Sequence, residues 1–451
     1  MTRELQPPGP YRLARGLCTV LMRHTPMQFL TRIAIRYGGI ARIPLARGFL
    51  YLVSAPELVK ALLVDHRTRF IKNTRYSVMQ KVLGQGLLLS EGEVWRRQRS
   101  AAQPSFRPGA LERQVAWMSP MIAAFLDGWD ARQNDDATIE LSTEFERLAQ
   151  ALAGRLLFGS VFAQHGAVIV GITESMRKFW PAVPRFLRPL TKKRRAENSE
   201  RLAQTLAQLD AQILALIDES RASAEPCMLA TLGADAADGC MPFTREELGD
   251  QMKTLFFAGY ETTATSMIWT HYLLGRHPTV YSRVLEEVDR MPAGRTLTVE
   301  QLDALTYVEQ VFKETLRLYS PIHSLSRVAQ EECELGGYVL PKGATAMVSL
   351  YASHRLPQYW PHPRRFDPER FTAAQSAARH RFSYLPFAAG HRNCIGATLA
   401  MVEAKLIIAQ IARRFRLHLV TRAPVRPHAG TTMHPSHAIR MRIESRGAPI
   451  V

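Results

Sequence analysis

The chain has 451 residues, of which 46% are apolar and 22% are charged, which is typical of a folded globular protein and excludes a disordered or fibrous one. Its five cysteines are scattered and form no CxxC pair, which argues against a disulfide framework or a zinc site and favours a reducing, cytoplasmic location. The 58 basic and 40 acidic residues give a formal net charge of +18, which favours an acidic partner protein or an anionic membrane surface. Nucleic acid is not expected, because no recognised binding motif accompanies the charge, and a basic surface without a specific partner stays open.

The N-terminal residues 1–34 are interpreted as a basic and apolar extension. Charged residues such as Arg15, Arg23 and Arg32 interrupt its apolar part, which argues against a signal peptide. Nowhere does the chain contain an uninterrupted apolar run of about eighteen residues, so no transmembrane anchor is predicted.

The next segment predicts a small β region. Residues 40–54 alternate apolar and polar character on both sides of Arg47-Gly48, which indicates a hairpin. A helix is predicted from about Pro56 to Asp65, and residues 68–90, rich in Gly, Ser and Thr, are expected to be irregular.

Two aligned side chains stand out in the helix that follows. Trp95 and Arg99 are four residues apart and therefore share a helical face. An amphipathic helix with an ordinary core tryptophan is the alternative. Residues 112–160 and 197–222 also carry helical periodicity, without chemistry that can be assigned.

Basic and aromatic residues interleave over residues 177–195. Such a pattern can indicate contact with a membrane surface, so peripheral membrane contact is kept as a hypothesis. Residues 223–243 are expected to form a loop.

A long central helix is predicted to begin after Thr244. Thr244 and Glu247 fit a capping box, and the apolar pattern continues to about Arg276. Pro278 then suits the first turn of the following helix.

The middle of this long helix contains residues that are costly there. Gly259 weakens a helix by roughly 1 kcal/mol relative to alanine, and a buried Glu261 needs a partner or water. The hydroxyl of Thr262 can return to the carbonyl of Ala258 and bend the helix, which would leave room beside it for a diatomic ligand and water. A capped surface helix is the alternative interpretation.

Several later features predict elements that support the fold. Glu314 and Arg317 lie three residues apart on a predicted helix over 304–319 and can form a charge pair, which is most often solvated. Short alternating runs predict a small sheet over 322–350, and strands over 417–445 with a turn near Thr431 to His434.

A single cysteine is presented by the stretch Phe387-Ala-Ala-Gly-His-Arg-Asn-Cys-Ile-Gly396, which is followed by an apolar-periodic run from Ala397 to Phe415. This predicts a loop that carries Cys394 and a helix behind it. A cysteine just before a helix N-terminus is favoured as the thiolate. Together with Arg392, it suits an axial bond to haem iron and a cation for a haem propionate. A buried structural cysteine is the alternative.

The spacing F-x-x-G-x-R-x-C-x-G resembles the haem-binding signature of the cytochrome P450 superfamily. Further segments are similar to that family in the same order: W-x-x-x-R at Trp95 and Arg99, A-G-x-E-T at 258–262, E-x-x-R at Glu314 and Arg317, and P-E-R-F ending at Phe371. The resemblance covers the chain from about residue 35 to its end.

The resemblance implies a role for each matched residue. The fold would be mainly α with a smaller β region (α+β), as one catalytic domain over 35–451 whose β-rich parts lie at about 35–70 and 322–350. Haem b would lie between the 245–276 helix and the 385–415 loop and helix. The implied haem contacts are the thiolate of Cys394 and the residues Trp95, Arg99, Arg327, Phe387, Arg392 and Gly396.

The remaining implied residues act on oxygen, on the scaffold or on substrate. Glu261 and Thr262 would activate dioxygen, and Arg370 would complete a structural cluster with Glu314 and Arg317. Segment 177–195 would cover the substrate channel. Candidate pocket residues are Phe257, Ala258, Ile322 and Met433, although Ser320 and His323 depart from the usual prolines in that turn.

The expected activity is insertion of one oxygen atom from O2 into an apolar small molecule such as a fatty acid, a terpene or another secondary metabolite. Electrons would come from NAD(P)H through a separate acidic ferredoxin or flavodoxin-type partner, and the protein is expected to be a monomer. Candidate docking residues are Arg96, Arg97, Lys313 and Arg413. A haem-thiolate isomerase or dehydratase, and a haem gas-binding protein that is not an enzyme, stay open as alternatives.

Overall fold

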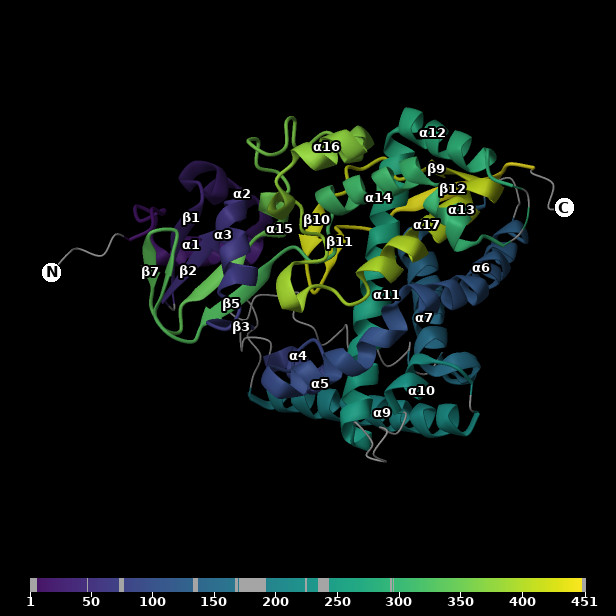
Figure 1. The fold of residues 1–451 in the computed structure, drawn as a ribbon, viewed down its shortest axis with the longest axis horizontal. Coiled ribbons are helices and arrows are strands. Elements are labelled where there is room, and N and C mark those ends of the chain that lie inside the picture. The colour runs from purple at the N-terminus through teal and green to yellow at the C-terminus, as the bar shows by residue number, and fades with distance from the viewer. Residues whose placement is uncertain are drawn as a thin grey trace. The chain divides into compact units, whose positions relative to one another are not determined.

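The chain folds mainly into helices, with short strands gathered in small sheets (Figure 1). The predicted class, mainly α with a smaller β region, is therefore confirmed. A computed structural model describes residues 6–46, 48–72, 77–132, 137–166, 169, 192–223, 225–233, 243–292, 294 and 296–447. The chain divides into two compact units: a first unit of Met1–Thr74, Ala123–Ser142 and Thr265–Val451, and a second unit of Arg75–Ile122 and Thr143–Ala264.

The first unit contains the strands and most of the short helices. Its helices are α1 (Arg15–His24), α2 (Pro26–Tyr37), α3 (Pro56–Lys60), α12 (Pro278–Asp289), α13 (Val299–Asp303), α14 (Thr306–Leu318), α15 (Leu350–Ser353), α16 (Ala373–Ala378) and α17 (Ala397–Arg414). A π-helical turn, η1 (Ala61–Asp65), continues α3, and 3-10 turns form η6 (Pro368–Phe371), η7 (Arg381–Ser383) and η8 (Gly390–Arg392).

The strands of the first unit form four sheets within the described residues. A five-stranded sheet has the order β1 (Ile40–Leu45), β2 (Gly48–Val53), β8 (Thr345–Val348), β5 (Leu325–Ala329) and β3 (Phe70–Lys72). The smaller sheets are β4 (Thr138–Glu140), β12 (Arg440–Ser445) and β9 (Phe415–Leu419); β6 (Cys333–Leu335) and β7 (Tyr338–Leu340); and β10 (Pro427–Ala429) and β11 (Met433–Pro435).

The predicted hairpin over 40–54 is confirmed as β1 and β2, paired from Ile40 with Val53 to Leu45 with Gly48. Its two faces enter different cores, because side chains alternate along a strand. Ile43 and Leu52 pack with residues of α1 and α2, including the fully buried Cys18. Residues 6–34 are thus packed against the sheet, and the N–H of Arg42 donates to the carbonyl of Pro8 at 2.9 Å.

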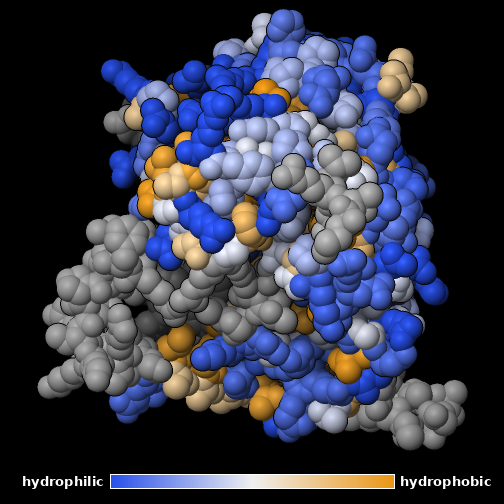
Figure 2. Space-filling view, turned by 90° about the vertical axis from the view of Figure 1, so that its left-hand side faces the viewer, coloured by the Kyte–Doolittle hydropathy of each residue, from blue (hydrophilic) through white to orange (hydrophobic). Residues whose placement is uncertain are grey.

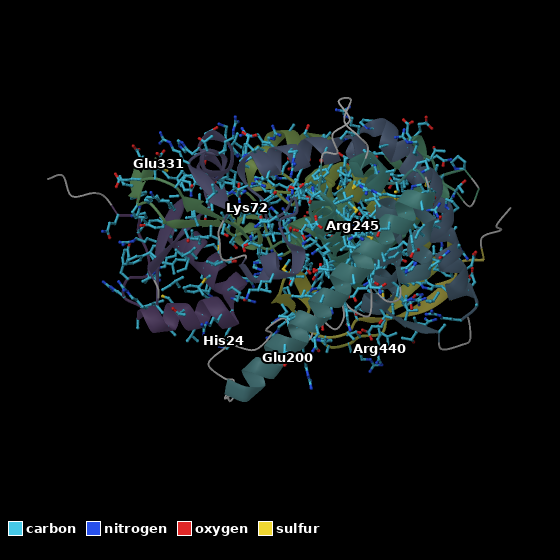
Figure 3. The ribbon with its side chains drawn as sticks, turned by 90° about the horizontal axis from the view of Figure 1, so that it is seen from below. His24, Lys72, Glu200, Arg245, Glu331 and Arg440 are labelled. Carbon is cyan, nitrogen blue, oxygen red and sulfur yellow. The ribbon has the colours of Figure 1, made fainter. Side chains whose placement is uncertain are left out.

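The second unit is helical throughout its described part. It contains α4 (Ser77–Leu83), α5 (Gly92–Ala102), the 3-10 turns η3 (Gln103–Phe106) and η4 (Gly159–Val161), α9 (Lys192–Ser223) and α10 (Met228–Gly233). Three helices have residues in both units: α6 (Pro108–Asp130), α7 (Leu141–Phe158) and α11 (Arg245–Arg276). Figure 3 shows α9 as one long helix, with Glu200 near one end.

The predicted capping box at the start of α11 is confirmed. The N–H of Thr244 donates to Glu247 Oε2 at 2.9 Å, and the N–H of Glu247 donates to Thr244 Oγ1 at 3.1 Å. Both contacts satisfy backbone groups that a helix start leaves without an intrahelical partner. Pro278 likewise begins α12, as expected.

Three expectations about secondary structure were wrong. Residues 68–90, expected to be irregular, contain β3 and α4; the helical pattern of 112–160 is interrupted by β4; and the expected loop over 223–243 contains α10. The two strands are three residues long and exist through pairing with β5 and β12, which lie far away in sequence. Such short non-local pairing leaves little periodic signal. Most of segment 177–195 lies outside the described residues.

The described helices include none with both the length and the apolar character needed to cross a membrane. Figure 2 shows the face at the β1–β2 end, where hydrophilic residues predominate and hydrophobic ones appear in small separate groups. Large apolar side chains exposed near the N-terminus are Tyr11, Leu13, Leu17, Val20 and Ile35.

Candidate active site

The loop from Phe387 to Gly396 presents Cys394 on a fixed backbone. The N–H of Cys394 donates to the carbonyl of Phe387 at 2.9 Å, and the N–H of Asn393 donates to the carbonyl of Gly390 at 3.1 Å. These bonds close the loop on itself, while the side chain of Cys394 stays exposed. The buried structural cysteine that the sequence left open is therefore excluded at this position.

The loop also needs an uncommon backbone at two positions. Gly390 has φ +75°, and a Cβ there would lie 2.2 Å from the carbonyl oxygen of Leu63, so a larger residue would be both strained and in collision. Ala388 has φ +60° without being glycine, a conformation that costs roughly 1–3 kcal/mol. Strain of this kind persists where the surrounding contacts hold the backbone in place.

Helix α17 follows the loop directly, with Gly396 at its N-cap position. The helix is anchored by the buried Lys405, whose Nζ lies 3.3 Å from a carboxylate oxygen of Asp303 and 3.3 Å from one of Glu309. Cys394 is exposed and lies just before the N-terminus of this anchored helix, and such a position favours the ionised form of a cysteine, the thiolate. This donor fits haem iron, which is also bound by thiolate in other proteins.

Behind the loop, the first unit holds the predicted charge cluster. Arg317 forms a bidentate pair with Glu314, with N–O distances of 2.6 and 2.7 Å, and neither side chain has accessible surface. Arg370 Nε lies 3.5 Å from Glu314 Oε1. Arg317 also donates to the carbonyl oxygens of His354, Pro363 and Arg365 at 2.9, 2.7 and 3.0 Å. The pair is thus buried and fully hydrogen-bonded, and not the solvated pair that is usual on helices.

Two buried residues next to this cluster were missed by the sequence analysis. His354 Nε2 accepts the N–H of Leu385 at 2.9 Å, and burial together with the nearby charges of Arg317 and Arg355 lowers the pKa of His354 to about 3. Tyr384 donates to the carbonyl of Lys313 at 2.8 Å, and burial raises its pKa well above the usual value. Neither residue belongs to a local motif, so only their burial reveals them.

The turn before β5 is held from two sides. The N–H of Met433 donates to the carbonyl of Pro321 at 2.8 Å, and the ring of His323 hydrogen-bonds the backbone of Gly430. Ile322, between these anchors, keeps 37% of its surface exposed. In β5, Arg327 is buried, and its Nη1 donates to the carbonyl of Ser326 at 2.9 Å.

Met433 itself has no accessible surface. Its carbonyl accepts the indole N–H of Trp269 at 2.7 Å, and Trp269 stacks on Tyr319 with 3.9 Å between ring centroids. The side chain of Met433 therefore belongs to the core that fixes the β10–β11 hairpin. Of the four predicted pocket residues, this one is fully covered, whereas Ile322 and Ala258 are exposed.

In the second unit, the middle of α11 has the local geometry that its sequence predicted. Thr262 Oγ1 donates to the carbonyl of Ala258 at 2.7 Å. Ala258 and Gly259 are exposed although most of this helix is buried, and Glu261, Thr262 and Phe257 are partly exposed. A helix that exposes its smallest residues in mid-length leaves room for a group to approach its backbone.

The remaining predicted residues lie on α5 and at charged surface positions. Trp95 and Arg99 are both partly buried on α5. Each candidate docking cation already has a partner: Arg96 pairs with Glu93, Arg97 with Glu247, and Lys313 with Glu309 at 2.6 Å. Arg413 donates to the carbonyl of Gly294 at 2.6 Å.

Comparison with known proteins identifies the family and the fold. The sequence matches the family model for cytochrome P450 over residues 7–439. A structural neighbour, the crystal structure of the cytochrome P450DA heme domain, has a TM-score of 0.83 at 24% identity and covers 98% of both chains. The predicted fold is therefore confirmed.

Three relatives are similar over most of their length. Cyclooctatin synthase of Streptomyces melanosporofaciens is 32% identical over 441 residues, which cover 94% of this chain and 92% of that protein. Cyclooctat-9-en-7-ol 5-monooxygenase of the same organism is 32% identical over 421 residues, with coverages of 92% and 88%. Cytokinin hydroxylase of Arabidopsis thaliana is 30% identical over 400 residues, with coverages of 85% and 77%.

Replacing Arg317 with methionine should lower the free energy of unfolding by about 3–5 kcal/mol, because the variant leaves the Glu314 carboxylate buried without its bidentate partner. Urea unfolding followed by circular dichroism measures the change. Lys313→Met, on the same helix but at the surface, should cost no more than about 1 kcal/mol. Equal losses in both variants would contradict the importance of the buried pair.

The stability of the protein should fall as the pH drops from about 6.5 towards 3, in part because of His354. Its folded-state pKa of about 3 lies below the unfolded value of about 6.5, so in this window only the unfolded state binds the proton. For one such histidine the slope reaches about 1.4 kcal/mol per pH unit. Unfolding free energies at several pH values should show a shallower slope for His354→Gln than for the wild type, and equal slopes would contradict this role of His354.

Proposed function

Because the chain belongs to the cytochrome P450 family and is a monooxygenase of that family, we propose that it inserts one oxygen atom from dioxygen into an apolar small molecule. Membership of the family implies a haem, dioxygen and reducing equivalents. A terpene is our first candidate substrate, since two relatives at 32% identity carry the names cyclooctatin synthase and cyclooctat-9-en-7-ol 5-monooxygenase. A fatty acid or another secondary metabolite is the second.

The observation that carries the proposal is the exposed Cys394 in a loop closed by its own backbone. We assign its thiolate as the group that would bind the iron of haem b. The bound haem would supply an iron centre whose thiolate ligand favours cleavage of the O–O bond. Backbone N–H groups around the sulfur would moderate its electron donation.

Glu261 and Thr262 are assigned to proton handling. The hydroxyl of Thr262 donates to the carbonyl of Ala258, and a hydroxyl that donates one hydrogen bond can also accept from water or from another donor. Glu261, the preceding residue, would hold the proton that oxygen reduction consumes. General acid catalysis of this kind contributes about 10²–10⁴ in rate.

Four further side chains are assigned to the haem propionates. Trp95 and Arg99 lie one turn apart on α5, Arg392 lies two residues before the cysteine, and Arg327 lies in β5. Arginine suits a carboxylate because its planar fork can donate two hydrogen bonds. Phe387 and Gly396 would frame the thiolate. Glu314, Arg317 and Arg370 would retain the haem indirectly, by holding the segment that precedes the loop.

Electrons would arrive from NAD(P)H through a separate acidic ferredoxin or flavodoxin-type protein. The net charge of +18 favours such a partner. Arg96, Arg97, Lys313 and Arg413 are kept as docking candidates, and their present partners would have to be exchanged or shared on binding. We further propose that the two units act as one catalytic domain, because the family match includes residues of both.

Cys394→Ser tests the proposed ligand. Purified wild-type protein, reduced under carbon monoxide, should show a red-shifted Soret band that the variant lacks, because the band depends on thiolate ligation. Cys333→Ser, which removes another thiol, should keep the shifted band. Titration of ferric protein with cyclic terpenes and with fatty acids then identifies the substrate class through the spin-state change. A shifted band that persists in Cys394→Ser would refute the assignment.

Thr262→Ala tests the assigned proton handling. With a surrogate ferredoxin system, oxygenated product per NAD(P)H consumed should fall by about tenfold or more, with release of hydrogen peroxide, because proton delivery is impaired. Thr263→Ala removes a neighbouring hydroxyl that lies on a different face of the helix, and its yield of oxygenated product should stay near that of the wild type. The same loss in both variants would point to a general defect of the helix.

A further inference from the structure

A hollow of about 630 Å³ lies on the first unit, beside the Glu314–Arg317–Arg370 cluster, and is lined by residues between Gln358 and His380. Its volume falls in the range of roughly 300–1,000 Å³ that is usual for small-molecule sites. The residues around it that carry or can carry charge are His362, Arg365, Asp367, Glu369, Arg370, Arg379 and His380. None of these has been assigned a ligand so far.

Besides Arg370, the carboxylate of Glu314 is bound by other groups. Both of its oxygens bind Arg317, and Oε1 also accepts the N–H of Asp367 at 2.9 Å. Arg370 Nε stays 3.5 Å from that oxygen and makes no hydrogen bond within the described part of the chain. Its Nη2 donates only to the carbonyl of His362, at 3.1 Å. Arg370 therefore shares the single carboxylate of Glu314 with Arg317, and it lines the hollow.

Arg379 is a second cation of this kind. Its guanidinium carbon lies 4.2 Å from the ring centroid of Trp360 and 4.9 Å from that of Phe371, and it donates to the carbonyl of Arg370. Across the described residues, no carboxylate lies within ion-pair distance of it. Burial lowers its pKa, as it does for Arg370, which shows that both charges are held partly out of water. A partly desolvated cation is stabilised by a nearby anion.

The balance of the remaining groups is also positive. Glu369 is engaged by Arg283 at 2.6 Å, which leaves Asp367 as the acidic group facing Arg365, Arg370 and Arg379. The indole N–H of Trp360, which lines the same hollow, is buried and finds no acceptor among the described residues. Around the hollow, three guanidinium groups thus face one acidic group, Asp367, that has no arginine partner of its own in the described part of the chain.

We propose that this hollow binds a small phosphate-type oxyanion, with Arg365, Arg370 and Arg379 as the cationic ligands. Guanidinium groups match a tetrahedral oxyanion because their planar forks donate paired hydrogen bonds. The volume admits either free phosphate or the phosphate group of an organic ester. Bound there, the anion neutralises the excess charge next to Glu314 and stabilises the segment that leads to the cysteine loop. The site is independent of the oxidised substrate.

Isothermal titration calorimetry of the full-length protein tests the site, with inorganic phosphate and phenyl phosphate in buffer of constant ionic strength. Arg365→Gln removes an exposed guanidinium from the hollow, and Arg364→Gln is the matched control, since Arg364 is also exposed but does not line it. Arg379→Gln is a second variant, and its secondary structure is checked by circular dichroism.

Wild type and Arg364→Gln should bind inorganic phosphate with the same affinity, and Arg365→Gln should bind it at least tenfold more weakly. Arg379→Gln should lose binding further while remaining folded. Tighter binding of phenyl phosphate by tenfold or more would identify an organic ester as the ligand, and equal affinities would identify the free ion. Absence of binding by the wild type, or equal weakening in Arg364→Gln and Arg365→Gln, would overturn the proposal.

Discussion

The buried pair of Glu314 and Arg317 is the interaction on which the first unit depends. Burying two charges is costly unless each finds its full set of hydrogen bonds. Here the guanidinium meets both carboxylate oxygens and three backbone carbonyls from residues 354–365. One side chain of α14 therefore fixes an irregular segment that carries no regular backbone pairing of its own.

The same segment leads to the cysteine loop, and the constraint continues there in the backbone. His354 joins the segment to the loop by accepting the N–H of Leu385, and the hydroxyl of Tyr384 donates to the carbonyl of Lys313 on α14. The loop then closes over Gly390, whose contact with Leu63 leaves no space for a side chain. The thiol is thus held by a chain of buried hydrogen bonds and not by local propensity.

Beside Arg370 and Arg379, at the hollow, this arrangement leaves an excess of positive charge. Three arginines, Arg317, Arg370 and Arg379, meet two acidic groups there, Glu314 and Asp367, so the cluster has one positive charge in excess. Such an excess can be met by solvent or by a bound anion. If an anion binds, the rigidity of this part of the protein would depend on the anions in the surrounding solution, and the anion would take no part in the reaction.

The sequence alone determined the family motifs, the helix start at Thr244, the hairpin at 40–54 and the contact between Thr262 and Ala258, because each depends on residues close together in the chain. The assignment of Cys394 as the thiolate ligand also comes from the sequence, since five matched positions lie within ten residues, and it stays a prediction. Tertiary structure decided what depends on distant partners: the strands β3 and β4, the buried state of His354 and of Met433, and the engagement of the four surface cations. Whether Glu314 and Arg317 form a solvated surface pair or a buried anchor is set by the carbonyl groups that surround them, and no local pattern encodes those groups.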